Sequence, residues 1–213
     1  MTPVRVAVLA SGGGTNLQAL LDRLDARAPA RVVRVIASHP DAGALDRARR
    51  AGVPAAVLPD PGDATALLAA VGDAQLVVLA GWLKQVPAAV VARFRFRMIN
   101  IHPALLPGFG GPGMYGRRVH EAVLASGATL SGATAHYVDE EYDHGPIIAQ
   151  WPVPVHAADT PASLAARVLQ AEHELLPRVV LELARRAVPE APVRLFATGS
   201  TFLAGDKLAV DFS

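Results

Sequence analysis

The stretch VRVAVLASGGGTNLQALLDRL, residues 4–24, contains an apolar run, a glycine-rich turn and a helical pattern in that order. Residues 4–10 are almost entirely apolar, which is typical of a strand buried in a sheet. The glycines at 12–14 interrupt the run. Leucines then recur at the spacing of one helix face, at positions 17, 20, 21 and 24. The stretch therefore predicts a strand, a tight turn and a helix.

The same alternation continues along the chain. Further short apolar runs lie at 32–37, 54–58, 75–80 and 98–101, and helical segments lie near 41–52, 63–71 and 87–95. Asp41 is the expected N-cap of the first of these helices, and Gly52 is its expected end. Apolar strands that alternate with helices predict a Rossmann-like α/β fold, a mostly parallel twisted sheet with helices on both faces.

The pattern changes after residue 128. Two β-like stretches, 130–138 and 146–155, are joined by the acidic turn DEEYDHG, which favours antiparallel strands toward the C-terminal half. A long helix is expected to begin near Asp159–Thr160. The segment from Val193 to Val210 has the pattern of a terminal hairpin. No internal repeat or long linker divides the chain, so a single domain is expected.

The composition excludes several classes of function. The 213 residues include 20 basic and 19 acidic side chains, which argues against a long nucleic-acid footprint or a polybasic membrane anchor. No cysteine is present, so disulfides, thiolate nucleophiles and zinc–thiolate sites are excluded. No apolar run reaches the ~20 residues of a spanning helix, and no secretory signal is visible. A cytoplasmic protein is expected.

The glycine turn and His102 both follow predicted parallel strands, so they are expected at one edge of the sheet, where ligands of such folds bind. SGGGTN, residues 11–16, could bind phosphate through the amides of Gly13, Gly14, Thr15 and Asn16 and the Thr15 hydroxyl. The alternative is a plain turn capped by Thr15 or Asn16. A dinucleotide fingerprint fits poorly, because its third glycine is missing.

Asn100 and His102 are two positions apart on a predicted strand, so their side chains share a face while Ile99 and Ile101 occupy the other. Pro103 favours extended backbone at His102. An amide can hydrogen-bond a developing oxyanion, and an imidazole can move a proton near neutral pH. The pair therefore indicates acyl-transfer chemistry; the alternative is a satisfied core pair.

The turn HYVDEEYDHG, residues 136–145, holds four carboxylates and two histidines. For Asp139, Glu140 and Glu141 a solvated turn is the preferred interpretation, and no metal-ligand spacing is present, so no metal is expected. Asp143 differs because Gly145 and Pro146 bend the chain directly after it. Titratable groups therefore gather in the middle of the sequence, as an active site requires.

Four segments together resemble the folate-dependent formyltransferase family, in particular the phosphoribosylglycinamide formyltransferases: SGGGTNLQALLD at 11–22, VVLAGWLK at 77–84, INIHPALLPGF at 99–109 and HYVDEEYDHGPII at 136–148. The resemblance spans roughly residues 4 to 185. It implies a transferase of de novo purine biosynthesis. The implied reaction passes a formyl group from 10-formyltetrahydrofolate to the amine of 5-phosphoribosylglycinamide, without a metal.

The resemblance also assigns site residues. It places catalysis on Asn100, His102 and Asp143, substrate phosphate on Gly14, Thr15 and Asn16 beside Gly13, and the glycinamide on Glu172. It implies that folate contacts two segments, formed by Leu83, Lys84, Gln85 and Val86 and by Val138, Asp139, Glu140, Glu141 and Tyr142. Asn100 and a protonated His102 would stabilise an oxyanion, and Asp143 would hold the imidazolium. The uncharged loop 103–116 would cover the site.

Some positions depart from the commoner family pattern. Lys84, Thr15 and His144 stand where Arg, Ser and a small residue are frequent, and the loop GFGGPGMYG at 108–116 departs from shorter versions. The expected division is a phosphate-binding half (1–101), a catalytic and folate-binding half (102–185) and a hairpin extension (186–213). Small-molecule partners and a monomer or homodimer are expected. The alternatives are a deformylase, a tRNA formyltransferase-like enzyme, or a non-catalytic sugar-phosphate binding module.

Overall fold

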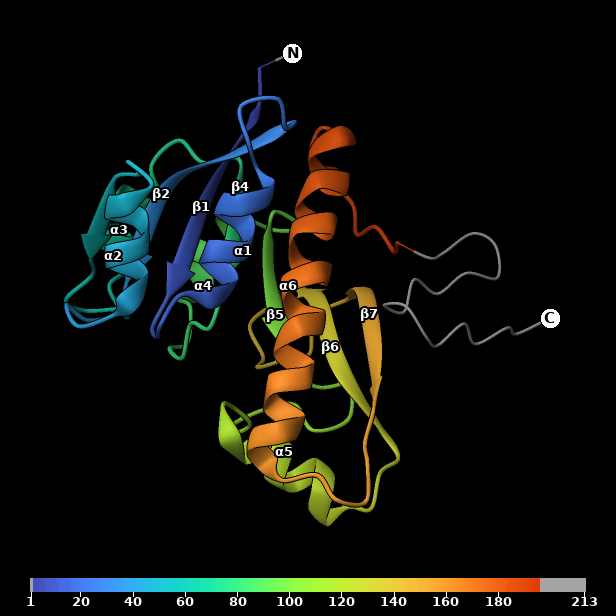
Figure 1. Cartoon of the computed structure of the whole chain (residues 1–213). Coiled ribbons are helices and arrows are strands. Elements are labelled where there is room, and N and C mark those ends of the chain that lie inside the picture. The colour runs from blue at the N-terminus through green and yellow to red at the C-terminus, as the bar shows by residue number, and fades with distance from the viewer. Residues whose placement is uncertain (1, 196–213) are drawn as a thin grey trace.

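The computed structural model describes residues 2–195, which form one seven-stranded sheet flanked by helices (Figure 1). The strands are β1 (Val4–Ala10), β2 (Ala30–Ala37), β3 (Ala55–Val57), β4 (Leu76–Leu79), β5 (Met98–His102), β6 (Leu130–Tyr137) and β7 (Ile147–Pro154). The helices are α1 (Thr15–Arg23), α2 (Gly43–Arg50), α3 (Ala64–Val71), α4 (Ala88–Arg93), α5 (Arg117–Ala125) and α6 (Pro161–Arg185).

The strand order is β3-β2-β1-β4-β5-β6-β7. Strands β1 to β5 pair in parallel, whereas β6 is antiparallel to β5 and β7 is antiparallel to β6. The mostly parallel fold with antiparallel C-terminal strands is therefore confirmed. Strands β2 and β3 extend the sheet on one side of β1, and β4 then pairs with β1 on its other side. Such a switch point opens a crevice at the carboxyl ends of the strands.

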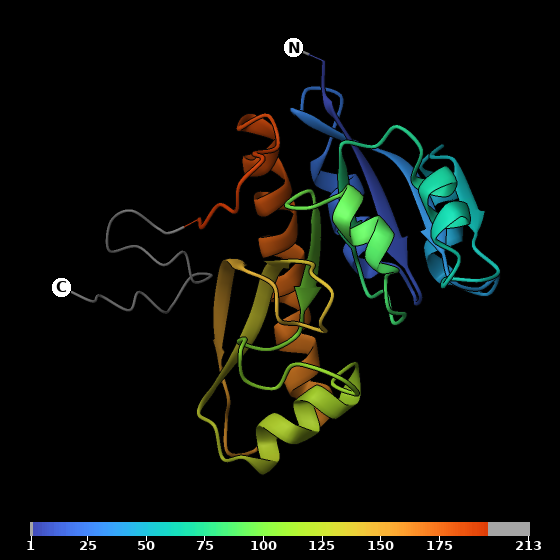
Figure 2. The ribbon, with the colours of Figure 1, turned by 180° about the vertical axis from the view of Figure 1, so that it is seen from behind.

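Alternation along the strands divides the core between two layers of helices. Val6 and Val8 of β1 pack with α1, α2 and α6, and Ala7 and Leu9 pack with α3 and α4 on the opposite face (Figure 2). In β5, Ile99 and Ile101 belong to the first layer and Met98 to the second. Asn100 and His102 therefore share the face of Met98 and follow it toward the carboxyl edge.

Two local expectations need correction. The N-cap of α2 is Ala42 and not Asp41, because the helix entry is set by backbone contacts to the glycine turn: the Ala44 amide donates to the Gly12 carbonyl at 3.2 Å. Helix α5 was not expected, although Gly116 precedes it and Gly127 follows it closely. Residues 193–195 form no strand, and the remainder of the predicted hairpin lies outside the described residues.

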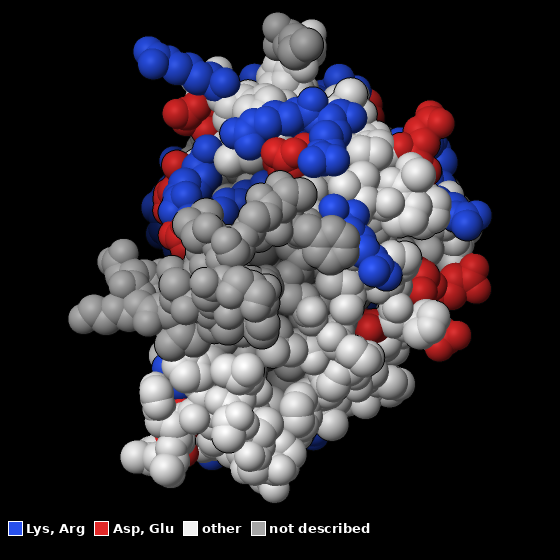
Figure 3. Space-filling view, turned by 90° about the vertical axis from the view of Figure 1, so that its right-hand side faces the viewer, with Lys and Arg blue, Asp and Glu red and all other residues white. Residues whose placement is uncertain are grey.

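Charged side chains are distributed unevenly along the sheet axis. On the face next to β7, basic and acidic groups lie side by side toward the end that carries the N-terminus, and the end near α5 is mostly uncharged (Figure 3). The uncharged end is the one toward which the parallel strands run. Among residues 2–195, no helix is both long and apolar enough to cross a membrane.

Candidate active site

A cavity of about 810 Å³ opens at the carboxyl ends of the parallel strands. It is lined by residues from five stretches that are far apart in the sequence. All three predicted catalytic residues line it, as do all nine predicted folate-contacting residues and both Asn16 and Glu172. A volume of this size suits a drug-sized organic ligand. Gly13, Gly14 and Thr15 are not among the residues that line this cavity.

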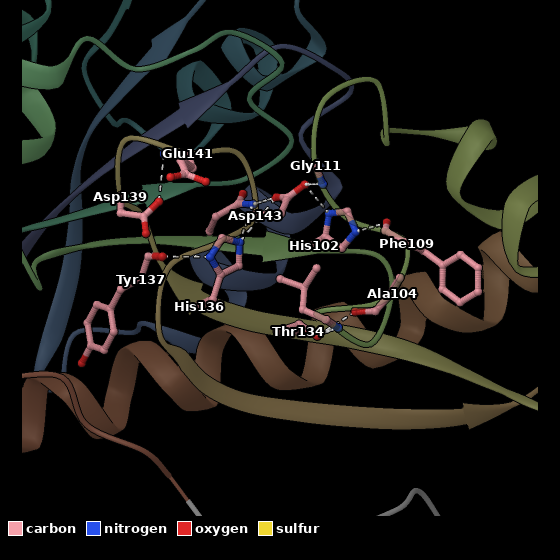
Figure 4. Close-up of polar contacts among 12 residues, drawn as sticks. His102, Ala104, Phe109, Gly111, Thr134, His136, Tyr137, Asp139, Glu141 and Asp143 are labelled. Atoms are coloured by element: carbon pink, nitrogen blue, oxygen red, sulfur yellow. Dashed lines mark hydrogen bonds and ion pairs between the residues drawn. The ribbon is translucent and has the colours of Figure 1, made fainter.

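Asn100, His102 and Asp143 all line the cavity. Figure 4 shows the Asp143 carboxylate pointing toward the His102 ring. Asp143 Oδ2 lies 3.4 Å from His102 Nδ1, and Asp143 Oδ1 accepts from Asn100 Nδ2 at 3.4 Å. The two β5 side chains reach the carboxylate because strand alternation points them the same way. The carboxylate reaches them from the loop after β6, which is the antiparallel neighbour of β5.

His102 is 3% exposed, and both of its ring nitrogens face acceptors. Nε2 donates to the Phe109 carbonyl at 2.9 Å, and Nδ1 faces Asp143. Burial lowers the pKa of His102 below its ordinary value, while Asp143 and the Phe109 carbonyl oppose that shift. Burial thus favours the neutral ring, whereas the two facing acceptors favour the imidazolium. Protonation of His102 becomes easier when its pKa rises, as it would beside a developing negative charge.

His136 is a member of the site that was not among the predicted residues. Its Nδ1 donates to the Tyr137 carbonyl at 2.8 Å, and its Nε2 lies 3.1 Å from Asn100 Nδ2 and 3.6 Å from Asp143 Oδ1. The β5–β6 register places His136 directly opposite Asn100. The Asn100 carboxamide is thereby held on two sides, by His136 and by Asp143, and its orientation is fixed.

The loop after β5 is fastened to the same groups. The Gly111 amide donates to Asp143 Oδ2 at 3.0 Å, and the Phe109 carbonyl accepts from His102. Gly110 lies between them with no room for a side chain, because a Cβ there would be 2.5 Å from the Leu106 side chain and 3.1 Å from Asp143 Cβ. The start of the loop is anchored by Thr134, whose hydroxyl bonds the backbone of Ala104 and Leu106.

The carboxylate of Asp143 stays ionised in this setting. Burial alone would raise its pKa, but His136, the charge of His102 and the Gly111 amide together hold the pKa of Asp143 below its ordinary value. The site thus combines a stable anion with an imidazole of lowered pKa. Two groups whose pKa values are shifted by burial and by specific partners are typical of a catalytic centre.

The glycine turn leads into α1 with Gly14 as N-cap, in a left-handed conformation with φ of +74°. A Cβ at Gly14 would lie 2.7 Å from the Cα of Ala44, so only glycine fits. No side chain caps the helix, so the interpretation of Thr15 or Asn16 as a cap is wrong. The N–H groups of the first turn remain open to an anion.

Asn16 connects the turn to the main cavity. Its Nδ2 donates to Glu172 Oε2 at 2.5 Å, and Glu172 projects from the middle of α6 with 7% of its surface exposed. Burial raises the pKa of Glu172 to about 7, and the Asn16 hydrogen bond only partly offsets this. A buried carboxylate with one amide partner is suited to receive a cationic amine, which would ionise it fully.

The raised pKa of Glu172 predicts a pH-dependent stability. Between its ordinary pKa and about 7 the folded state holds a proton that the unfolded chain has released, so stability falls as pH rises through this range. Glu172→Gln keeps an acceptor for Asn16 but has no proton to release. It should therefore abolish a pH-dependent loss of about 3 kcal/mol in the free energy of unfolding. Urea unfolding at pH 5 and pH 7.5 measures it. Glu190→Gln, at an exposed carboxylate, is the control, and equal pH slopes for the wild type and Glu172→Gln would contradict the assignment.

A second hollow of about 290 Å³ is lined by residues of α1, α2 and α6. Thr15, Arg47 and His173 line it. Arg47 Nε donates to the Gly13 carbonyl at 2.7 Å and its Nη1 to Gln18 Oε1 at 3.1 Å, and the buried Nε2 of His173 has no hydrogen-bond partner among the described residues. Burial and the charge of Arg47 lower the pKa of His173. The hollow therefore places the Thr15 hydroxyl and the Arg47 guanidinium beside the carboxylates of Asp22 and Glu174, which also line it.

The described residues contain no cluster of three or more His, Cys, Asp or Glu side chains arranged to hold a metal ion. His120 of α5 also lines the main cavity; it is 4% exposed and its Nδ1 has no partner. The concentration of histidines between residues 102 and 156 was the only signal in the sequence for His120 and His136. The pattern did not indicate which of them reach the site.

Comparison with known proteins agrees with this geometry. A formyl transferase family model matches residues 4–180. The chloroplastic phosphoribosylglycinamide formyltransferase of Arabidopsis thaliana is 44% identical over 187 residues, covering 83% of this chain and 64% of that protein. The chain therefore spans less than two thirds of this plant relative. The phosphoribosylglycinamide formyltransferase of Haemophilus influenzae is 35% identical over 185 residues, covering 83% and 85%.

Solved structures give the same picture. Glycinamide ribonucleotide transformylase 1 from Symbiobacterium toebii aligns with a TM-score of 0.78 at 39% identity, over 86% of this chain and 89% of that one. A formyltetrahydrofolate deformylase from Pseudomonas syringae aligns with a TM-score of 0.76 at 27% identity, over 87% of this chain and 62% of that one. The fold is thus common to both enzyme types, and sequence identity is higher with the transformylase.

Proposed function

This chain belongs to the formyl transferase family, and we propose that it transfers a formyl group from 10-formyltetrahydrofolate to the amine of 5-phosphoribosylglycinamide. The products would be formylglycinamide ribonucleotide and tetrahydrofolate, as in de novo purine biosynthesis. The observation that carries the proposal is the meeting of Asn100, His102 and Asp143 on one cavity that also reaches Glu172. Neither a deformylase nor a binding module needs a carboxylate placed to receive an amine.

The folate co-substrate would occupy the wide part of the cavity. Leu83 and Val86 on one side and Val138 on the other supply apolar surface, and the neighbouring backbone offers hydrogen-bonding groups to a pterin. When bound, it supplies the formyl carbon. Lys84, exposed on the cavity rim, would face the acidic tail of the folate.

The catalytic residues act on the charge and the proton of the reaction. The amine nitrogen forms a bond to the formyl carbon, whose oxygen takes up negative charge; Asn100 Nδ2 and a protonated His102 stabilise it. Asp143 stabilises the imidazolium. The proton lost by the amine passes through these groups to the folate nitrogen as its bond to carbon breaks. His102 Nε2 can serve only when the Phe109 carbonyl moves away, so segment 108–111 would move on substrate binding.

The substrate phosphate would bind in the second hollow, between the amides of Gly14–Asn16, the Thr15 hydroxyl and Arg47. Arg47→Ala should then raise the KM for the ribonucleotide about tenfold or more, since a charge-assisted hydrogen bond is lost. The KM for 10-formyltetrahydrofolate should not change. Steady-state kinetics with each substrate varied in turn measures this. Arg49→Ala, on the exposed side of the same helix, is the control, and an unchanged ribonucleotide KM in Arg47→Ala would contradict the placement.

One assay separates the candidate functions. The protein is incubated with 10-formyltetrahydrofolate, with and without glycinamide ribonucleotide, and tetrahydrofolate release is followed. Release that depends on the amine supports the transferase. Release without the amine indicates a deformylase, and no release indicates a binding module. The cytoplasmic setting, the three-part division of the chain and the monomer or homodimer state stay predictions.

A further inference from the structure

The catalytic carboxylate is carried by a backbone conformation that needs support. Asp143 has φ of +55°, in the left-handed region that residues with a Cβ adopt uncommonly. Such a residue persists where its surroundings hold it in place. The turn between β6 and β7, which carries Asp143, also carries Val138–Tyr142 along the cavity. What fixes this turn therefore fixes both the carboxylate and one wall of the site.

The two ends of the turn are fixed by the sheet. The Val138 amide donates to the Met98 carbonyl at 2.9 Å, and the Tyr137 amide donates to the Pro146 carbonyl at 2.9 Å. Gly145 is packed so closely that a Cβ there would lie 2.0 Å from the Tyr137 carbonyl oxygen. In the described part of the chain the backbone of residues 139–144 makes no hydrogen bond to a strand; β5 contacts only the Asp143 side chain there, through Asn100 and His102.

One side chain spans that part. Asp139 Oδ1 accepts from the Glu141 amide at 3.0 Å, and Asp139 Oδ2 lies 2.8 Å from His144 Nδ1 (Figure 4 shows the first of these contacts). Glu141 lies two residues before Asp143, and His144 directly follows it. A single carboxylate thus ties the chain on both sides of the catalytic residue.

We propose that Asp139 and His144 form a brace that positions Asp143 for the proposed formyl transfer, a role that rests on the proposed function. The two residues do not touch the reacting atoms. They hold the backbone that aims Asp143 at His102. Both lie at the surface, where a single ion pair has a modest effect, so the brace tunes the site and does not hold the fold together.

The brace depends on pH because its donor is a histidine. The hydrogen bond to Asp139, then the charges of Asp139 and Glu141, raise the pKa of His144 above its ordinary value. The loop after β4 lines the same cavity as the turn, and its one charged side chain is Lys84. Gln85 Nε2 of that loop donates to the Glu140 carbonyl of the turn at 3.4 Å. The pair is ionic at pH 6 and becomes a weaker neutral contact as pH rises through the raised pKa. Support for Asp143 therefore declines at alkaline pH.

His144→Ala tests the brace. At pH 6 its kcat/KM should be about two- to fivefold below wild type, the range for one exposed ion pair, and at pH 9 the two proteins should converge. Asp139→Asn should behave the same way, and the double variant should be no worse than either single one. His156→Ala, another exposed histidine, should match wild type at both pH values. A His144→Ala deficit that is absent at pH 6, or the same at pH 6 and pH 9, would overturn the proposal.

NMR supplies a reading that needs no turnover. In Asp139→Asn the pKa of His144 should fall toward its ordinary value, and in His144→Ala the backbone amide signal of Asp143 should shift. An unmoved Asp143 amide would overturn the brace even in an active enzyme. Conversely, if wild type transfers no formyl group while both NMR changes occur, the proposed function fails and the structural brace stands.

Discussion

His102→Ala should lower kcat at least about 10²–10³-fold, the usual cost of losing one group that stabilises an oxyanion. The buried imidazole of His102 faces the Asp143 carboxylate through Nδ1 at 3.4 Å. Its Nε2 donates to the Phe109 carbonyl in the loop after β5. Burial lowers its pKa, so its proton is available only when negative charge develops beside it. Alanine supplies neither a donor nor a proton, and nothing else in the described site stands in the same position.

Asn100→Ala should give a loss of similar size for a related reason. Its carboxamide is oriented by His136 and Asp143, so its donor requires no reorganisation during the reaction. Both variants should keep the circular dichroism and unfolding midpoint of a folded protein, because both side chains line a cavity and not the packed core. Single-turnover kinetics at saturating substrates measures the effect. Near wild-type turnover in either variant would discard the assignment of the site.

The strands and most helices could be predicted because their signals are local. The apolar runs of β1 and β4 and the leucine spacing of α1 are visible within a few residues of sequence. Helix α5 was missed because it buries only Val119, His120 and Val123, and its other residues divide evenly between charged and apolar ones. An apolar pattern this short does not distinguish a helix from a loop in the sequence.

The site was predictable where strand geometry alone decides it. Asn100 and His102 share a face because alternation on β5 requires it. His136 depends on the register of β6 against β5, and that register is set by contacts between segments more than 30 residues apart. The pairing of Asp139 with His144 likewise depends on how the turn closes. Residue types and spacing indicated that these groups gather, whereas their partners follow only from the tertiary structure.

Asp143→Asn should lower kcat about 10²–10⁴-fold, the range for a group that takes part in proton transfer. Asparagine is nearly the same size and tolerates the left-handed backbone at this position, so the turn should keep its shape. The change removes the negative charge that faces His102 Nδ1 at 3.4 Å and that opposes the lowering of its pKa. The imidazolium should therefore be harder to form in the variant.

Hydrogen bonding makes the same substitution costly in either amide orientation. Asp143 Oδ1 accepts from Asn100 Nδ2, and Oδ2 accepts from the Gly111 amide at 3.0 Å. An NH₂ group in place of either oxygen would set one donor against another and leave a buried donor unpaired. The carboxylate is the one state of this side chain that satisfies both neighbours, which agrees with its lowered pKa.

The pH–rate profile distinguishes these effects from simple misfolding. Transfer that needs the imidazolium should increase as pH falls through the pKa of His102, and this midpoint should move to lower pH in Asp143→Asn because the stabilising anion is gone. In wild type, protonation of Asp143 itself should matter only below its ordinary pKa, because its pKa is lowered. A variant with reduced kcat but an unmoved midpoint would show that Asp143 acts on shape alone, and a variant with wild-type kcat would remove it from the mechanism.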